Sequence, residues 1–174
     1  MIDPTGLVQI LLLEQVVHKI PPGNINLART GIATQDSDYT ASAVPSEARL
    51  AIDGNRNSDF NQKSCSHTGG NEPAWWRLEL KKKSKISVVV IAIRSDCCMD
   101  RFKGAELRIG NSQDATVNPI CGKVSAVKGS NYLFCCDGME GKYISVVIPD
   151  RHEFLSLCEV EVYGAKPIEG THCK

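Results

Sequence analysis

The sequence predicts an all-β fold, a β-sandwich or jelly roll, from two strand patterns and the polar segments between strands. Residues 86–93 form an almost unbroken apolar run rich in valine and isoleucine, which is typical of a strand covered on both faces. Trp76, Leu78 and Leu80 alternate with a second, partly charged set, which indicates a half-buried strand. Loops rich in Gly, Asn, Ser and Asp, such as residues 53–71, separate such segments.

Three further segments complete the predicted strands. Residues 105–109 and 158–162 alternate apolar with charged side chains, and residues 143–148 form a second run rich in β-branched residues. Short strands separated by turn signals are typical of sandwiches and jelly rolls. We therefore expect one domain at residues 24–166, followed by a short tail at residues 167–174.

The first 23 residues have a helical pattern instead. Asp3 fits an N-cap, Pro4 fits the first helical position, and residues 21–23, Pro-Pro-Gly, would end the helix. Four apolar residues then fall at coiled-coil spacing: Ile10, Leu13, Val17 and Ile20. This short N-terminal helical extension can be an oligomerisation helix, a remnant of a targeting sequence or a helix packed on its own domain. As a signal peptide it lacks a basic start.

The balance of charge excludes several classes of partner. The chain has 174 residues, with 20 Lys and Arg against 20 Asp and Glu, so its formal net charge is zero. A sequence-blind nucleic-acid binder needs a surplus of basic residues, and so does a polybasic membrane-surface protein. No apolar run approaches the length of about 18 residues expected of a membrane span. We expect neither nucleic-acid binding nor membrane insertion.

The eight cysteines indicate a disulfide-bonded, secreted protein. Their number is even, their spacings are wide, and no C-x-x-C zinc pattern occurs. So many cysteines are unusual in a reducing compartment, where they would stay scattered thiols. The cysteines are Cys65, Cys97, Cys98, Cys121, Cys135, Cys136, Cys158 and Cys173.

Residues 94–101, Arg-Ser-Asp-Cys-Cys-Met-Asp-Arg, are the first candidate binding segment, because they follow the predicted buried strand directly. Asp96 can orient the guanidinium of Arg94 by charge-assisted hydrogen bonds, and such a fixed fork of donors suits sugar hydroxyls. A surface cluster of ion pairs is the alternative. Cys97 and Cys98 can form a stiff apolar ring with each other, or can bond elsewhere or stay free.

The second candidate segment, residues 53–61, is dense in Asp and Asn and is followed by Ser64 and His67. Its oxygens suit Ca²⁺, although the spacing is not that of an EF-hand and an ordinary Asp/Asn turn explains the composition too. A lone histidine such as His67 is usually a hydrogen-bonded loop residue. We expect no enzyme, since the sequence has no nucleophile elbow, phosphate loop or H-E-x-x-H motif.

Taken in order, these segments resemble the F-type lectins, the animal fucolectins, over about residues 24–166. The family's sugar motif is a histidine, about two dozen residues, R-x-D and a second basic residue, matched here by His67, Arg94, Asp96 and Arg101. The gap of 26 residues after His67 is slightly longer than usual, which we attribute to residues 68–72. The resemblance is carried by residues 51–56, 64–67, 73–78, 94–98, 101 and 157–162.

The resemblance implies a jelly-roll sandwich of the galactose-binding-domain type whose loops bind the terminal L-fucose of glycans. His67 would bond the axial hydroxyl, and Arg94 and Arg101 would reach the ring oxygen and neighbouring hydroxyls. The Cys97–Cys98 ring would pack on the sugar. Phe60 would help to enclose the methyl group of the fucose, and Asp96 would orient an arginine.

The family also has a structural Ca²⁺, which would order the sugar-facing loops. The side-chain ligands would be Asp53, Ser64 and Glu159, and the carbonyl ligands would be those of Leu50, Asn55 and Cys158. Leu50 replaces the asparagine usual in the family, which a carbonyl ligand tolerates.

The same match pairs Cys65 with Cys158 and Cys121 with Cys136. Cys135 and Cys173 have no family counterpart, so their pairing is inferred from parity alone, with an intermolecular bond as the alternative.

Members of the family form trimers, and clustered sites raise avidity for glycans. Their role would be recognition of glycans in innate defence or agglutination. The main alternative function is a discoidin-like adhesion module that binds lipid or protein through bulky apolar loop tips. A carbohydrate-binding module detached from a glycosidase is a third possibility.

Overall fold

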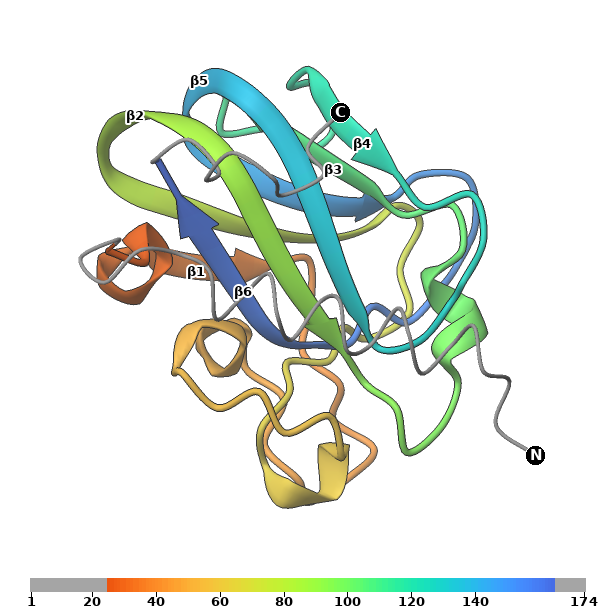
Figure 1. Cartoon of the computed structure of the whole chain (residues 1–174). Coiled ribbons are helices and arrows are strands. Elements are labelled where there is room, and N and C mark those ends of the chain that lie inside the picture. The colour runs from red at the N-terminus through yellow and green to blue at the C-terminus, as the bar shows by residue number, and fades with distance from the viewer. Residues whose placement is uncertain (1–24, 165–174) are drawn as a thin grey trace.

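The computed structural model of the chain describes residues 25–164 (Figure 1). The expected N-terminal helix at residues 1–23 and the tail at residues 167–174 lie outside the described residues. The strands are β1 (Ile32–Gln35), β2 (Ala74–Ile93), β3 (Glu106–Gly110), β4 (Ile120–Lys123), β5 (Asn131–Ile148) and β6 (Leu157–Tyr163), and the short 3-10 helices are η1 (Leu27–Thr30), η2 (Ala48–Ile52), η3 (Phe60–Gln62) and η4 (Met99–Phe102). Among these residues no helix has the length and apolar character needed to cross a membrane. The all-β prediction is confirmed.

The strands form one antiparallel sheet that folds over on itself, because β2 and β5 are long and bent. The first half of β2 pairs with β1 and the second half with β6, while β5 runs beside both halves. On its other side, the second half of β5 pairs with β3, and β3 pairs with β4. The register of β2 against β5 shifts between Glu79 and Ser84, which marks the bend. The two halves therefore face each other as the layers of a sandwich.

The sequence pattern predicted two separate strands where the structure has the single strand β2. Residues 81–83 are exposed lysines and carry no apolar periodicity, yet their backbone stays extended around the bend. The apolar periodicity is confined to the parts of β2 that face the core. The predicted strand at residues 143–148 is likewise only the last part of β5, because the first part of β5 has no regular apolar pattern. The strand begins twelve residues before residue 143.

The core lies between the two layers. Trp76 and Leu78 reach it from the first half of β2, Val89 and Ile91 from the second, and Ile144 from β5; all five are completely buried. The predicted alternation at residues 74–80 and the burial of residues 86–93 on both faces are confirmed. Burying this many aliphatic side chains, each worth about 1.5–3 kcal/mol, is the main stabilising contribution.

The last strand, β6, is buried on both faces, whereas its sequence pattern predicted one polar face. Glu159 and Glu161 are only 1% and 5% exposed. The turn after η2 covers them: the amide of Gly54 donates to the Glu159 carboxylate, and the guanidinium of Arg56 forms a two-pronged ion pair with Glu161. Charged side chains are buried here because partners from a distant segment satisfy them.

The strand ends position the candidate site. Both long strands bend at the same end of the molecule, at the upper left of Figure 1, and Ala74 pairs with Ile148. The segments that follow β2 and β5, residues 94–105 and 149–156, therefore emerge together at the opposite end.

Candidate functional site

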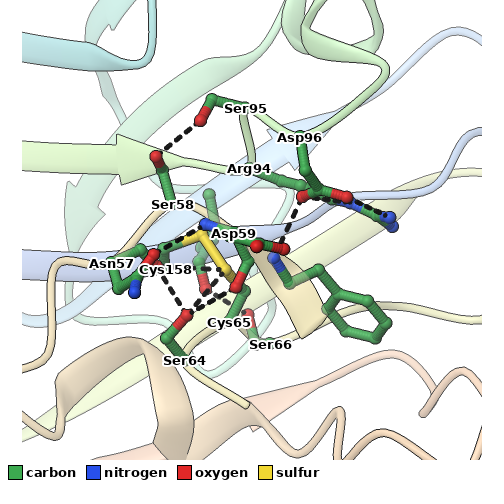
Figure 2. The surroundings of a disulfide bond; sticks show 12 residues. Asn57, Ser58, Asp59, Ser64, Cys65, Ser66, Arg94, Ser95, Asp96 and Cys158 are labelled. Atoms are coloured by element: carbon green, nitrogen blue, oxygen red, sulfur yellow. Dashed lines mark hydrogen bonds and ion pairs between the residues drawn. A yellow bond between two sulfur atoms is a disulfide. The ribbon is translucent and has the colours of Figure 1, made fainter. Parts of the chain in front are cut away.

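His67 is held by the backbone on both sides. Ser66 donates its amide to the carbonyl of Leu157 at 2.8 Å, and Thr68 donates to Leu155 at 3.0 Å, so this stretch runs beside the start of β6. The His67 amide donates to Ser46 at 2.9 Å. The Cys65–Cys158 disulfide fastens the same segment covalently (Figure 2). The backbone of His67 is thus fixed without help from its own side chain.

The imidazole of His67 is buried, and its protonation follows from its contacts. Nδ1 lies 2.8 Å from the carbonyl oxygen of Thr68, which can only accept, so Nδ1 carries the hydrogen. Burial lowers the pKa of His67 from 6.5, and the charges of Arg94 and Arg101 lower it further. The ring is therefore neutral at pH 7, and Nε2 is an acceptor. Nε2 bonds to no residue of 25–164, so its lone pair is left for a ligand.

Three aromatic rings surround this imidazole. Their centroids lie at 4.4 Å for Tyr39, 5.2 Å for Phe60 and 5.4 Å for Phe154. Phe60 was predicted from the sequence, but Tyr39 and Phe154 were not. Each is a single aromatic residue in a polar loop, far from His67 along the chain, and no local pattern marks it.

Arg94 is oriented by Asp96, as predicted. Nε and Nη2 of Arg94 donate to the carboxylate at 2.9 and 2.7 Å, and the same carboxylate accepts the amide of Phe60 at 2.9 Å (Figure 2). The hydrogen bond from Arg94 holds the pKa of Asp96 below its usual value, so this pair stays charged. The guanidinium lies 4.5 Å from the centroid of the Phe60 ring, and its Nη1 keeps a donor free of other described residues.

Arg101 lies in η4 and lines the same pocket as Arg94. Its guanidinium lies 5.0 Å from the centroid of the Phe154 ring, and its Nε lies 3.8 Å from a carboxylate oxygen of Glu153. No hydrogen bond joins its guanidinium to any residue of 25–164. Arg101 therefore presents more free donors than Arg94.

Cys97 and Cys98 are bonded to each other, which decides between the alternatives that the sequence left open. Cys98 has a φ of 63° and directly precedes η4 as its N-cap. A pocket beside it is lined by side chains that include Arg94, Arg101 and Phe154. The disulfide adds a stiff apolar surface to this pocket.

A second contact joins the loop of residues 94–98 to the segment that contains Phe60. The amide of Ser95 donates to the carbonyl of Ser58 at 2.8 Å, and the two hydroxyls lie 2.5 Å apart (Figure 2). The structure thus brings together all the residues predicted to contact a sugar. Free N–H donors, one imidazole acceptor and apolar rings converge, and this combination suits a ligand that carries both hydroxyls and an apolar group.

The residues predicted to hold Ca²⁺ lie around β6 and the two loops packed on it. Asp53 follows η2, and the adjacent amide of Gly54 contacts Glu159. The hydroxyl of Ser64 lies 2.6 Å from the carbonyl of Asn57. Among residues 25–164, no three His, Cys, Asp or Glu side chains are arranged so that they alone could hold a metal ion. The expected set has only two such side chains, Asp53 and Glu159, and takes its other oxygens from Ser64 and the carbonyls of Leu50, Asn55 and Cys158.

This oxygen set fits a hard cation. Glu159 is nearly inaccessible to solvent, and its burial, together with the nearby charges of Glu161 and Asp53, raises its pKa to about 8. A divalent cation here would offset the repulsion between these acids and stabilise the ionised carboxylate.

Three of the expected disulfides are present in the described part of the chain: Cys65–Cys158, Cys97–Cys98 and Cys121–Cys136. The third joins β4 to β5, and neither of its cysteines lines the pocket beside Cys98. The remaining expected pair, Cys135 with Cys173, involves Cys173, which lies outside the described residues.

Comparison with known proteins gives the family. A domain family described as "NedA-like, galactose-binding domain" matches residues 50–146. Fucolectin-1 of Anguilla japonica is 39% identical over 170 residues, covering 93% of this chain and 95% of that protein. The chain belongs to the fucolectin, or F-type lectin, family. The pentraxin fusion protein of Xenopus laevis is 41% identical over 150 residues, but this chain spans only 35% of its length.

Solved structures of the family have the same fold. The serum f-lectin (fucolectin) of Morone saxatilis superposes with a TM-score of 0.77 at 37% identity, covering 83% of this chain and 50% of that one. A fucose binding module of Streptococcus pneumoniae superposes with a TM-score of 0.72 at 30% identity, covering 84% of this chain and all of that one. The expected galactose-binding-domain sandwich is confirmed.

Proposed function

We propose that this chain is a secreted lectin that binds terminal L-fucose of glycans and catalyses no reaction. The observation that carries the proposal is the convergence of one neutral imidazole and two guanidiniums on the rings of Phe60 and Phe154, next to a pocket that is lined by Arg94, Arg101, Phe154 and Cys98. Relatives named fucolectins and a module described as fucose-binding support the choice of sugar.

The chemistry of the pocket suits a terminal fucose, which keeps three free hydroxyls and one apolar methyl group. Nε2 of His67 accepts a hydrogen bond from the axial hydroxyl, and Arg94 and Arg101 donate to the ring oxygen and neighbouring hydroxyls. The Cys97–Cys98 bridge packs on the ring, and Phe60 encloses the methyl group. A site of fixed donors and acceptors strongly rejects a sugar that lacks the matching hydroxyl, because its own polar groups are then left unpaired.

The test is a glycan array probed with the purified protein. Fucosylated glycans are expected to retain it, and the same glycans without fucose serve as matched controls. Free L-fucose should displace the bound protein. Equal retention on both sets, or equally strong displacement by monosaccharides other than L-fucose, would refute fucose as the ligand.

Secretion and assembly belong to the same proposal. The disulfides among residues 25–164 suit an oxidising compartment, and the related f-lectin of Morone saxatilis is a serum protein. Assembly into a trimer, and a role in innate recognition or agglutination, would combine weak single sites into useful avidity.

The alternative, a discoidin-like module, has no support in the site loops. Such a module needs bulky apolar side chains at the loop tips. The large exposed apolar residues between residues 25 and 164 are Ile25, Ile32, Val117 and Ile120, and none belongs to the loops around His67, Arg94 or Arg101.

A structural Ca²⁺ is the second part of the proposal. Asp53, Ser64 and Glu159 would hold it with the carbonyls of Leu50, Asn55 and Cys158. The ion would supply positive charge to a buried carboxylate and hold the turn after η2 against β6. Its support is the burial of Glu159 beside other acids.

Chelation is therefore expected to lower the melting temperature by about 5–10 °C, since saturation at 100 times the dissociation constant adds about 2.7 kcal/mol to the stability of the folded state. Differential scanning calorimetry with EDTA, against EDTA already loaded with Ca²⁺, makes the measurement. The variant Asp53→Ala should melt at the same temperature in both buffers. A wild-type melt that is identical in the two would remove the metal from the proposal.

A further inference from the structure

Each of the two arginines of the site contacts one carboxylate and one aromatic ring. Arg94 has a carboxylate at its edge, from Asp96, and an aromatic ring against its face, from Phe60. Arg101 likewise has the Glu153 carboxylate at its edge, at 3.8 Å, and the Phe154 ring against its face, at 5.0 Å. The family's sugar motif includes Asp96 but not Glu153, which lies in the loop of residues 149–156.

We propose that Glu153, backed by Phe154, is the positioning residue for Arg101, so that the loop after β5 decides which sugar hydroxyl this arginine contacts. The inference rests on the proposed fucose-binding function. It extends that function, because it assigns part of the specificity of the site to a segment outside the motif.

Glu153 is itself held in place. One of its carboxylate oxygens accepts Nε of Arg151 at 3.2 Å, and the other accepts the amide of Phe154 at 3.0 Å. Nη2 of Arg151 also donates to the carbonyls of Arg101 and Lys103, at 2.8 and 2.7 Å. The loop after β5 is thereby fastened to η4, so the position of Glu153 relative to Arg101 is fixed by the backbone on both sides.

Arg101 needs such support more than Arg94 does. The Arg94 guanidinium makes hydrogen bonds to its acid, whereas the Arg101 guanidinium makes none within residues 25–164. Glu153, with only 18% of its side chain exposed, is the acid within ion-pair distance of Arg101 in the described chain. Without that carboxylate, the guanidinium can rotate on its flexible stem.

The test compares wild type with Glu153→Gln, which keeps the size of the side chain and removes its charge. The affinity for L-fucose, measured by titration calorimetry, is expected to fall by about three- to tenfold, as for residues that share one ion-pair network. Glu72→Gln is the matched control, because Glu72 pairs with the exposed His152 at 3.3 Å and does not contact Arg101. This control should bind like wild type.

Deoxyfucose analogues then separate positioning from a general loss of structure. Arg101→Lys identifies the analogue whose missing hydroxyl Arg101 contacts, since this variant discriminates least against it. Glu153→Gln should lose discrimination against that same analogue and keep it against the others. This comparison is a ratio within each folded variant, so it stays informative even if the melting temperature falls.

The outcomes are distinct. A wild-type protein that does not bind fucose would end the proposed function. If wild type binds, then unchanged affinity in Glu153→Gln would overturn the inference, and so would an equal loss for every analogue.

Discussion

Replacing Arg94 by alanine is expected to lower the affinity for L-fucose by about 30- to 1,000-fold, which corresponds to about 2–4 kcal/mol. The guanidinium is fixed by Asp96 and lies against Phe60, so its free donor is already aimed when the sugar arrives. Alanine removes that donor, and a fucose oxygen is then buried without a partner. The fold should survive, because the Arg94 side chain interacts with Asp96 and the face of Phe60 and does not belong to the main core between the two layers.

Titration calorimetry measures the affinity, and a thermal melt checks the fold. Arg49→Ala is the control for loss of positive charge, because Arg49 lies in η2 with its side chain exposed. It should bind fucose normally. Arg94→Lys keeps the charge but not the two-pronged bond to Asp96, and most of the loss should remain. If Arg94→Ala binds as well as wild type, the assignment of the site is wrong.

Removing the Cys65–Cys158 disulfide is expected to have the largest effect on stability. The two cysteines are 93 residues apart, and cross-links that close loops of this length stabilise a fold by about 4–5 kcal/mol in the chain-entropy account. The double variant Cys65→Ala, Cys158→Ala avoids leaving a free thiol. Urea unfolding followed by fluorescence measures the loss.

This disulfide should also affect sugar binding, since it holds the segment that carries His67. The matched control is Cys121→Ala, Cys136→Ala, which opens a bridge of only 15 residues and is expected to cost about 3 kcal/mol. That bridge joins β4 to β5 and neither of its cysteines lines the pocket, so the control should keep its fucose affinity. Equal affinity in both double variants would show that the Cys65–Cys158 bridge does not order the site.

Much of the fold could be predicted locally. Burial on both faces of residues 86–93 and alternation at residues 74–80 are properties of short windows, because a strand repeats every two residues. The bend that joins these strands into β2 could not be predicted in this way. Its lysines face solvent and are not paired with residues of β5. The bend is held by the pairs on either side of it, Glu79 with Tyr143 and Ser84 with Gly141, which join β2 to a strand that is remote along the chain.

The residues of the site also fall into two groups: those that could be recognised in the sequence and those that only the fold brings to the site. The motif of His67, Arg94, Asp96 and Arg101 was recognisable in the chain, and so was the candidate Cys97–Cys98 bond, since their order and spacing are local or match a known family. Tyr39, Glu153 and Phe154 were not recognisable, because each acts on a residue at least 28 positions away and has neighbours that suggest only a turn. The burial of the β6 acids was also not predictable from periodicity: Glu159 and Glu161 have the pattern of the solvent face of a strand, and only the fold brings Gly54 and Arg56 to cover them. Periodicity reports which side chains prefer water, but the partners that allow a charge to be buried are chosen by the folding of the whole chain.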